Sequence, residues 1–532
     1  MQQLYYHGSI LTMEDDRRQA EALLVEDGRI KAVGSEEHVR AQMTAEAQEI
    51  DLAGKTLLPA FIDAHSHLTA VAVSMGLVDL SEAQSHQEVV ERLRAFKEER
   101  KLAPGEWITA FGYDQNNFRE KLAPTRAVLD QASTENPILL SHASGHMGVV
   151  NTKGLEVLGI SAQTPDPDGG KIGRDDQGQP TGYLEENAFI QQGAKVPRPD
   201  LADMLDMLEE AQALYLRYGI TTVQDGMVGQ RELAQLTAMA QADRLKVDTV
   251  GYLDLRNAGE CRAQAVRYWQ AYDHRLKIGG YKIFLDGSPQ GKTAWLTEPY
   301  TSGPEGFCGY PIYKDDEVQA FVRQALAENA QLLTHCNGDA AAEQLITAFA
   351  EERAKLPAEH RDDRPVMIHA QTVRPDQLER MAPLGMIPSF FVAHVYYWGD
   401  VHLTNLGRQR AERISPVKSA EKLDMVYTFH QDSPVLPPDM LDTVSCAVNR
   451  RTRAGVLLGE AQQISPWEAL KAVTINAAYQ YFEEDEKGSL KPGKLADLVI
   501  LDQDPLTVST EKIKSIKVLA TIKEGRVVYQ AQ

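Results

Sequence analysis

The chain has 532 residues, 43% of them hydrophobic and 25% charged, which is typical of a folded globular protein. Its formal net charge of −21 argues against nucleic acid or an anionic membrane as the main partner. No apolar run is long enough for a transmembrane helix, and the first residues lack the basic and apolar regions of a signal peptide. The four cysteines lie far apart without a CxxC pair, which indicates a reduced, cytoplasmic setting.

Both ends of the chain predict short β-strands. The five segments that alternate apolar and polar side chains, and that Gly and Asp turns interrupt, are 3–12, 21–34, 47–58, 496–506 and 518–530. Because the two ends share this pattern, we expect residues 1–57 and 486–532 to form one small β-sandwich domain together.

The middle of the chain, residues 58–485, alternates short apolar strands with helices. The eight segments that predict strands are 60–67, 219–226, 246–254, 279–287, 331–339, 364–373, 385–394 and 425–435. Helical patterns such as those of residues 230–244 and 315–330 lie between them. Repeated strand–helix units predict a parallel sheet with right-handed crossovers, and eight units predict an α/β protein with a (β/α)8 TIM barrel.

Three stretches interrupt this repeat, and each follows the carboxyl end of a predicted strand. A large insertion at about residues 70–200 follows the first strand, and shorter ones cover residues 287–312 and 395–418. Barrel enzymes build their active sites from loops in these positions. We therefore expect all three insertions to border the functional site.

The stretch LLPAFIDAHSHL ends the first predicted barrel strand with two histidines. Residues i and i+2 of a strand point to the same side, so His65 and His67 aim two imidazoles at one point, as a divalent metal requires. Taken alone, such a pair also fits surface or core histidines. Strands five, six and eight strengthen the metal interpretation, because they end in His335, His369 and Asp432.

Lys282 lies on the predicted fourth strand, where a charged amine is unfavourable unless it is paired or modified. One interpretation is modification, since a neutral lysine can react with carbon dioxide, and the resulting carbamate could bridge two metal ions about 3.5–4 Å apart. The other is an ordinary lysine paired with Asp286 or with the substrate. The sequence leaves both open.

This set of HxH, Lys, His, His and Asp on strands one, four, five, six and eight resembles the amidohydrolase superfamily. Longer stretches narrow the resemblance to amidohydrolase family 3, the N-substituted formamide deformylase-like branch. They are GYDQNNF, GHMGVVNTKGL, GGKIGRDDQGQPTGYLEE, GITTVQDG, KIFLDGS, THCNGDAA, IHAQTV and GSLKPGKLADLVILDQDP. The resemblance extends over essentially the whole chain. It implies a metal-dependent hydrolase of carbon–nitrogen bonds, mostly amides, with a small β domain built from both ends.

The resemblance also implies a metal centre of one or two ions. His65 and His67 would bind the more buried metal, and His335 and His369 a second one, with Lys282 as N6-carboxylysine between them. If Lys282 is not modified, one metal held by a subset of these groups is the simpler expectation. Nitrogen and oxygen ligands suit zinc and do not exclude manganese, iron or cobalt.

Asp432 is the expected catalytic residue. As a terminal or outer ligand it would take a proton from the metal-bound water and carry it to the leaving amine, with metal-bound hydroxide as the attacking group.

Four residues are candidates for binding the substrate. Tyr113 and His146, in the large insertion, could orient the scissile carbonyl, although internal hydrogen bonding of a lid is an equal alternative. His394, at the end of strand seven, departs from the family pattern, as does His430 just before Asp432. Trp295 belongs to a group of aromatic residues that could line an apolar pocket, or could instead hold the insertions or a dimer contact together. The others are Tyr300, Tyr396, Tyr397 and Trp398.

The leading hypothesis is therefore hydrolysis of a small N-substituted amide, such as an N-formyl or N-acyl compound with an apolar group. The nearer alternative is a cyclic amidohydrolase, a deaminase or a decarboxylase that uses the same centre. The farther alternative is a non-enzymatic regulatory or ligand-binding protein. The expected partner is a small-molecule substrate, and the sequence does not decide whether the chain forms a homo-oligomer.

Overall fold

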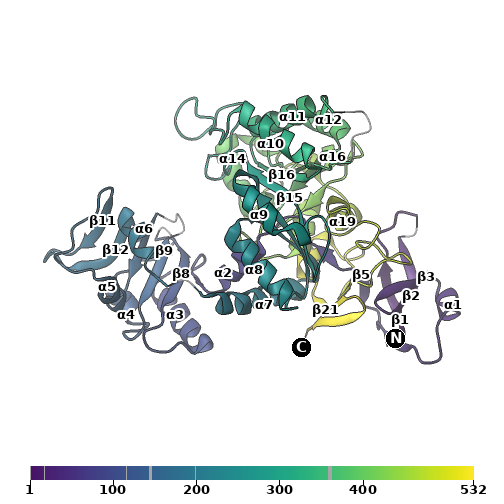
Figure 1. Ribbon diagram of the computed structural model, residues 1–532, viewed down its shortest axis with the longest axis horizontal. Coiled ribbons are helices and arrows are strands. Elements are labelled where there is room, and N and C mark those ends of the chain that lie inside the picture. The colour runs from purple at the N-terminus through teal and green to yellow at the C-terminus, as the bar shows by residue number, and fades with distance from the viewer. Residues whose placement is uncertain are drawn as a thin grey trace. The chain divides into compact units, whose positions relative to one another are not determined.

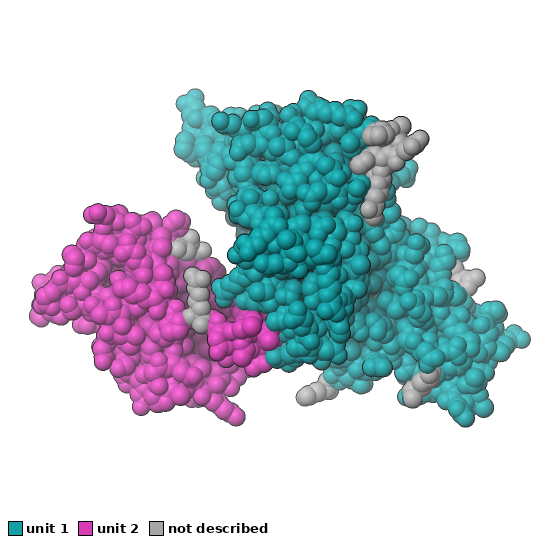
Figure 2. Space-filling view, in the orientation of Figure 1, with its two compact units in different colours: residues 1–69, 209–532 teal, residues 70–208 magenta. Residues whose placement is uncertain are grey.

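The computed structural model describes residues 2–16, 18–115, 117–142, 146–197, 199–356 and 362–531. The chain divides into two compact units (Figure 2). Residues 1–69 and 209–532 form unit 1, and residues 70–208 form unit 2. No helix of the described residues is long and apolar enough to cross a membrane.

Unit 1 contains an eight-stranded parallel sheet, which confirms the expected number and direction of the barrel strands. In paired order the strands are β6 (Phe61–Ile62), β13 (Ile220–Val228), β14 (Asp248–Asp254), β15 (Leu276–Phe284), β16 (Gln331–Cys336), β17 (Val366–His369), β18 (Ile387–Phe390) and β19 (Thr428–Phe429). The strand ladder is open between β19 and β6. The two ends meet just beyond the strands, where the backbone N–H of His67 donates to the carbonyl of Ser433 at 2.9 Å.

Helices cover the outside of this sheet, and side chains from its strands fill the inside. The helices between or after its strands include α7 (Leu201–Arg217), α8 (Gln230–Gln241), α9 (Ala258–Gln264), α10 (Asp315–Ala327), α11 (Asp339–Arg353), α12 (Pro375–Met381), α17 (Met440–Asn449), α18 (Pro466–Ala472) and α19 (Ile475–Gln480). Buried side chains such as Ile62, Val250, Leu333 and Ile368 belong to one core cluster. Because both faces are covered, the strands are nearly continuous apolar runs rather than alternating ones.

The chain termini form one mixed sheet of eight strands (Figure 1). Its strands are β1 (Gln2–Leu11), β2 (Gln19–Glu26), β3 (Arg29–Gly34), β4 (Gln48–Asp51), β5 (Thr56–Pro59), β20 (Leu498–Leu501), β21 (Val518–Lys523) and β22 (Arg526–Gln530). The joining of both ends was expected, but the described residues form a single sheet in place of the predicted sandwich. The reason is that β20 pairs with both β5 and β21, so the last strands extend the first sheet instead of stacking on it.

Unit 2 has a six-stranded sheet of its own. Its strands are β7 (Val78–Asp79), β8 (Ile108–Tyr113), β9 (Ile138–His142), β10 (Met147–Val150), β11 (Gly170–Arg174) and β12 (Pro180–Glu186). Helix α3 (His86–Arg100) packs on this sheet through Val89 and Leu93, which share a core with Ile108 and Leu140. The unit therefore has a separate hydrophobic core.

Buried ion pairs join the terminal sheet to the amino-terminal ends of the barrel strands. Asp248, at the start of β14, accepts from Lys487 at 2.6 Å, from Lys523 at 2.8 Å and from Arg275 at 3.0 Å. Four more charged side chains belong to this network of ion pairs, which then contains four cations and four anions. They are Lys277, Glu483, Asp497 and Glu524. The charges balance, so each buried ion has a partner.

We predict that Asp248→Asn lowers the free energy of unfolding by about 3–5 kcal/mol, because Lys487 and Lys523 are left buried with one counter-charge fewer. Burial alone would raise the pKa of Asp248, but the two lysines hold it well below its usual value. The Asp248 contribution is therefore present above the ordinary aspartate pKa of about 4 and is lost as the pH falls below it.

Denaturant unfolding of the parent and the variant, at neutral and at acidic pH, measures this difference. Glu412→Gln is the control, since its pair with Arg408 is exposed and such pairs contribute about 0–1 kcal/mol. Equal losses in the two variants would contradict the assignment.

Candidate metal centre

The carboxyl edge of the parallel sheet brings two histidines and one carboxylate together. His65 and His67 follow β6, and Asp432 follows β19. The Nε2 atoms of the two histidines lie 3.2 and 3.3 Å from Asp432 Oδ1, and the three ligand atoms lie within 4.8 Å of one another. Groups from strands one and eight can meet in this way only because the sheet curls until its two edges are neighbours.

Gln224, on β13, fixes the hydrogen position on His65. Its Oε1 lies 2.6 Å from His65 Nδ1, and its Nε2 donates to the Ala64 carbonyl at 2.8 Å and to the Tyr481 hydroxyl at 3.0 Å. Because Oε1 can only accept, His65 carries its hydrogen on Nδ1 and a lone pair on Nε2. Burial and the nearby Lys282 lower the pKa of His65 to about 3, so its ring is neutral.

The lone pair of His65 Nε2 faces the carboxylate of Asp432. Two such groups 3.2 Å apart repel each other unless a cation or a proton lies near both. The Lys282 amine, 3.3 Å from His65 Nε2, can donate to this lone pair, but it forms no hydrogen bond with Asp432 Oδ1. Within the described ranges, no donor forms a hydrogen bond with Asp432 Oδ1, although this atom is buried. A divalent cation would accept electron pairs from both groups at once. The residues present therefore fit a bound metal.

Asp432 and His369 both adopt the left-handed backbone conformation, with φ of 55° and 72°. Such conformations cost about 1–3 kcal/mol each and gather at functional sites. Here His369 is the last residue of β17 and Asp432 lies shortly beyond β19, and His369 Nε2 lies 4.0 Å from Asp432 Oδ2. Both residues thus bring a side chain to the centre from a strained backbone, although positive φ also occurs at other described residues, such as the neighbouring Ala370.

Lys282, on β15, is fully buried with its Nζ 3.3 Å from His65 Nε2. Burial lowers the pKa of Lys282 to about 7, against the opposing effect of Asp432. Asp286 does not pair with it, because its carboxylate accepts from the backbone N–H groups of Trp295, Asn337 and Gly338. The lysine therefore lies inside the centre as an amine that loses its charge easily.

His335, at the end of β16, stands beside His369 with 4.6 Å between the ring centroids. Its Nδ1 lies 3.3 Å from Asp286 Oδ1, and the amide of Asn337 lies 3.3 Å from its Nε2. A cation held by His335 Nε2 would have to replace the Asn337 contact. Of the expected histidine and aspartate ligands, His65, His67 and Asp432 present their ligand atoms within 4.8 Å of one another. Lys282 Nζ lies 3.3 Å from one of these atoms, His65 Nε2.

His394 is buried at the start of α13 (His394–Tyr397), and its Nδ1 lies 3.0 Å from Nε2 of His402 on α14 (Gly399–Leu406). Trp398 packs against the His394 ring at 4.6 Å. Tyr300 instead donates to the Ala294 carbonyl at 2.8 Å and packs inside the insertions. The aromatic group is therefore divided: Tyr300 holds the insertions together, whereas Trp398 lies against a candidate substrate-binding residue.

Tyr113 and His146 belong to unit 2. Tyr113 is fully buried on β8, and no described residue bonds to its hydroxyl. His146 is exposed and lies 3.1 Å from Glu186. Asn116 and Gly145, from the motifs that contain these residues, lie outside the described residues. The role of Tyr113 and His146 in substrate binding stays a prediction.

Sequence reasoning missed three side chains beside the expected ligands. Gln224 and Asp225 lie in the middle of β13 (Ile220–Val228), and His402 lies on a helix of the third insertion. Asp225 accepts from the Thr69 N–H at 3.2 Å, and burial raises its pKa to about 6 against the opposing effect of His67. The available signal for the first two was their place near the end of the predicted strand, residues 219–226 (GITTVQDG). His402 offered no such signal.

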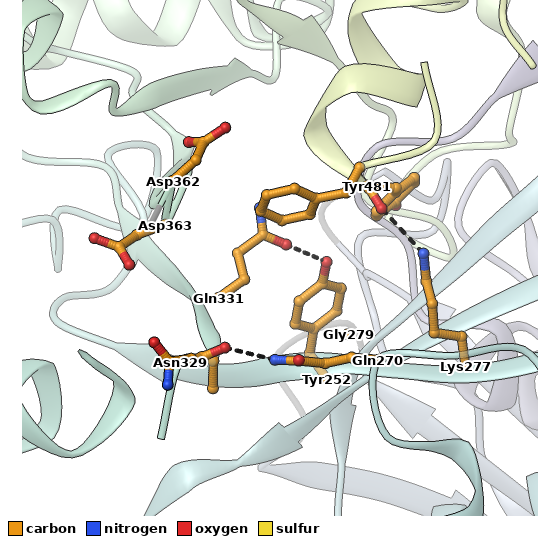
Figure 3. Close-up of a pocket in the computed structure, with 11 residues that line it drawn as sticks. Tyr252, Gln270, Lys277, Gly279, Asn329, Gln331, Asp362, Asp363 and Tyr481 are labelled. Atoms are coloured by element: carbon orange, nitrogen blue, oxygen red, sulfur yellow. Dashed lines mark hydrogen bonds between the residues drawn. The ribbon is translucent and has the colours of Figure 1, made fainter. Parts of the chain in front are cut away.

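A separate cavity of about 100 Å³ lies at the opposite ends of the strands, near the starts of β15 and β16 (Figure 3). Its polar groups mostly satisfy one another: Tyr252 donates to Gln331 at 2.5 Å, Gln270 to the Asn329 carbonyl at 2.6 Å, and Lys277 to the Tyr481 carbonyl at 3.0 Å. Barrel enzymes place their chemistry at the carboxyl ends of the strands. This cavity lies at the other ends of the strands, so we assign it no part in the reaction.

Comparisons with known proteins agree with this geometry. The family model described as the amidohydrolase family matches residues 48–529. The N-substituted formamide deformylase of Arthrobacter pascens is 30% identical over 98% of this chain and 97% of its own length. The Exoenzymes regulatory protein AepA of Pectobacterium carotovorum subsp. carotovorum is 27% identical over 72% of this chain and 82% of its own. The crystal structure of an uncharacterized metal-dependent hydrolase from Pyrococcus furiosus superimposes with a TM-score of 0.77 at 28% identity, over 95% of this chain and 100% of that chain.

We predict that Gln224→Leu weakens metal binding roughly 10- to 100-fold, the effect of losing the partner that orients a ligand imidazole. Equilibrium titration of the metal-stripped protein with Zn²⁺ measures the change. Gln480→Leu is the matched control, because Gln480 donates to the same Ala64 carbonyl at 2.7 Å without a contact to His65. Equal affinities in the two variants would show that Gln224 does not orient the ligand.

Proposed function

The chain belongs to the amidohydrolase family, and we propose that it hydrolyses the carbon–nitrogen bond of a small N-substituted amide with the help of a divalent metal. One observation carries the proposal: the buried His65 lone pair and the Asp432 carboxylate point at each other across 3.2 Å. That arrangement fits a bound cation. The full-length likeness to a formamide deformylase supports an amide as the substrate class.

The groups that would hold the metal are imidazole nitrogens and carboxylate oxygens. His65, His67 and Asp432 would hold one ion, and zinc suits this set. His335 and His369 would help to hold a second ion if Lys282 becomes N6-carboxylysine. In that reaction the neutral amine attacks carbon dioxide, one C–N bond forms, and one proton leaves to the solvent. When bound, the metal lowers the pKa of water from its high bulk value toward about 7 and polarises a carbonyl oxygen.

The residues of the chain then account for the proton balance. Water supplies the oxygen that bonds to the carbonyl carbon while the carbon–nitrogen bond breaks. Asp432 takes a proton from the water and delivers it to the leaving nitrogen, since a leaving amine must not depart as an anion. The products are an amine and a carboxylic acid, which is formic acid when the substrate is a formamide.

The neighbourhood of the centre supports an apolar substituent on the substrate. Phe391 lies 6.0 Å from the His369 ring and 5.9 Å from Trp398, centroid to centroid. Aromatic faces beside a polar centre are typical of pockets that bind small organic ligands. This favours an N-alkyl or N-aryl amide over a strongly charged one.

Two alternatives remain distinguishable. The same centre could open a cyclic amide or deaminate a heterocycle, because only the pocket selects the substrate. The relative with a regulatory name raises a second alternative, a ligand-binding role without turnover. The chain keeps a competent residue at each expected ligand position, which favours the enzyme.

We predict turnover of N-substituted formamides by the zinc-loaded protein, with N-phenylformamide and N-hexylformamide as first probes and release of amine as the readout. Asp432→Asn should lower kcat by at least about 10²-fold, the contribution of a positioned proton carrier. The panel also contains acetamides, cyclic amides and aminoheterocycles. No turnover of any member by metal-loaded protein would contradict the proposal, and turnover of the cyclic amides or aminoheterocycles alone would favour the nearer alternative.

We also predict a carbamate on Lys282. Protein loaded with zinc in ¹³C-bicarbonate should show one protein-bound carbamate carbon by ¹³C NMR, and Lys282→Arg should remove it, because a permanently charged guanidinium cannot attack carbon dioxide. A parent spectrum without this signal would remove the bridge and the second ion, and would leave the single-metal form of the mechanism.

A further inference from the structure

Two buried histidines, one at the end of predicted strand seven and one in the insertion that follows it, form a stacked pair. The rings of His394 and His402 are 5.3 Å apart and nearly parallel, at 5°. His394 Nδ1 and His402 Nε2 are 3.0 Å apart. Both side chains are almost completely buried, His402 at 0% exposure and His394 at 3%. One hydrogen therefore lies between the two rings. Whether His402 Nε2 or His394 Nδ1 carries it decides which nitrogen of His394 can donate a hydrogen bond.

The other ring nitrogen of His402, Nδ1, indicates which ring donates this hydrogen. His402 Nδ1 is buried and has no hydrogen-bond partner in the described part of the chain. If it carried a hydrogen it would be an orphaned donor, and buried unpaired N–H groups are rarer than unpaired acceptors. The hydrogen of His402 therefore lies on Nε2 and is donated to His394 Nδ1. A neutral His394 must then carry its own hydrogen on Nε2.

The His394 ring is also fixed in direction. Trp398 packs on it at 4.6 Å, and Phe391 meets it edge-on at 4.7 Å. Phe391 in turn lies 5.3 Å from the ring of His430, which is hydrogen-bonded to His369 at 3.1 Å. His394 is thus one aromatic ring away from the candidate metal centre. Unlike His402 Nδ1, His394 Nε2 is not among the fully buried polar atoms that lack a hydrogen-bond partner within the described residues, so a hydrogen on it is not an orphaned buried donor.

Both rings are suited to the neutral state. Burial lowers the pKa of His402 to about 4 and holds the pKa of His394 well below its usual value, with His402 adding to the effect. A neutral imidazole of fixed orientation donates a hydrogen bond without carrying a charge into an apolar pocket.

We propose that His402 is a positioning residue that holds His394 as an Nε2–H donor, and that His394 uses this hydrogen to bind the substrate carbonyl oxygen. The inference rests on the proposed function and deepens it by naming the group that would stabilise negative charge on that oxygen. A donor fixed before the substrate arrives needs no rearrangement during the reaction, which is how such groups accelerate acyl transfer.

The test combines four variants. His394→Leu and His402→Leu remove a donor. His394→Gln and His402→Gln place an amide N–H near the position of the lost Nε2. Thr404→Ala, an exposed position on the same helix, is the control. We expect kcat with the best amide of the panel to fall roughly 10²- to 10³-fold in His394→Leu and roughly 10- to 100-fold in His402→Leu. KM should change little, and each glutamine variant should recover most of the loss.

Two further measurements do not depend on turnover. The tautomer of His394 is read by ¹⁵N NMR of histidine-labelled protein, with the His394→Gln spectrum used for assignment, and we expect hydrogen on Nε2 in the parent. Zinc content by elemental analysis should be equal in all variants. Hydrogen on Nδ1 of His394, or loss of zinc in His402→Leu, would overturn the inference. A parent that holds the expected tautomer and zinc but turns over no amide would instead contradict the proposed function, and with it the substrate half of the inference.

Discussion

The structure depends on one electrostatic constraint, the meeting of buried electron pairs at the carboxyl edge of the parallel sheet. Gln224 places the hydrogen of His65 on Nδ1, so its Nε2 lone pair faces the Asp432 carboxylate at 3.2 Å. Such groups are stable together only around a cation or a proton. These groups lie where the strand ladder is open, between β6 and β19. The left-handed backbone of Asp432 turns the chain at the same place.

The two ends of the barrel strands carry opposite kinds of polar network. At the amino-terminal ends, Asp248 and its lysines form a balanced set of ions that joins the terminal sheet to the barrel. At the carboxyl ends, the polar atoms are left without full pairing, as Asp432 Oδ1 and His402 Nδ1 show. The first network stabilises the fold, whereas the second leaves electron pairs that a bound cation could accept. This division explains why the cavity near the starts of β15 and β16 is a poor candidate for the site of the reaction.

Much of this could be predicted from the sequence, because strand period and strand ends are local features. The HxH spacing placed His65 and His67 on one side, and eight apolar segments predicted eight parallel strands. The contacts of Gln224 and His402 could not be predicted, since a hydrogen bond across 159 residues, or between two short helices, leaves no periodic pattern. The sandwich was wrong for a related reason: alternation predicts strands but not whether β20 extends a sheet or stacks on it.

The measurement that tests the central claim most directly is the metal content of the protein, purified with bicarbonate present, beside a His65→Ala, His67→Ala variant. We predict one or two equivalents of a divalent metal in the parent and none in the folded variant, with circular dichroism to confirm that the variant is folded. Equal metal content in both proteins, or no metal in a parent offered zinc, would contradict the assignment of this edge of the sheet as a metal centre.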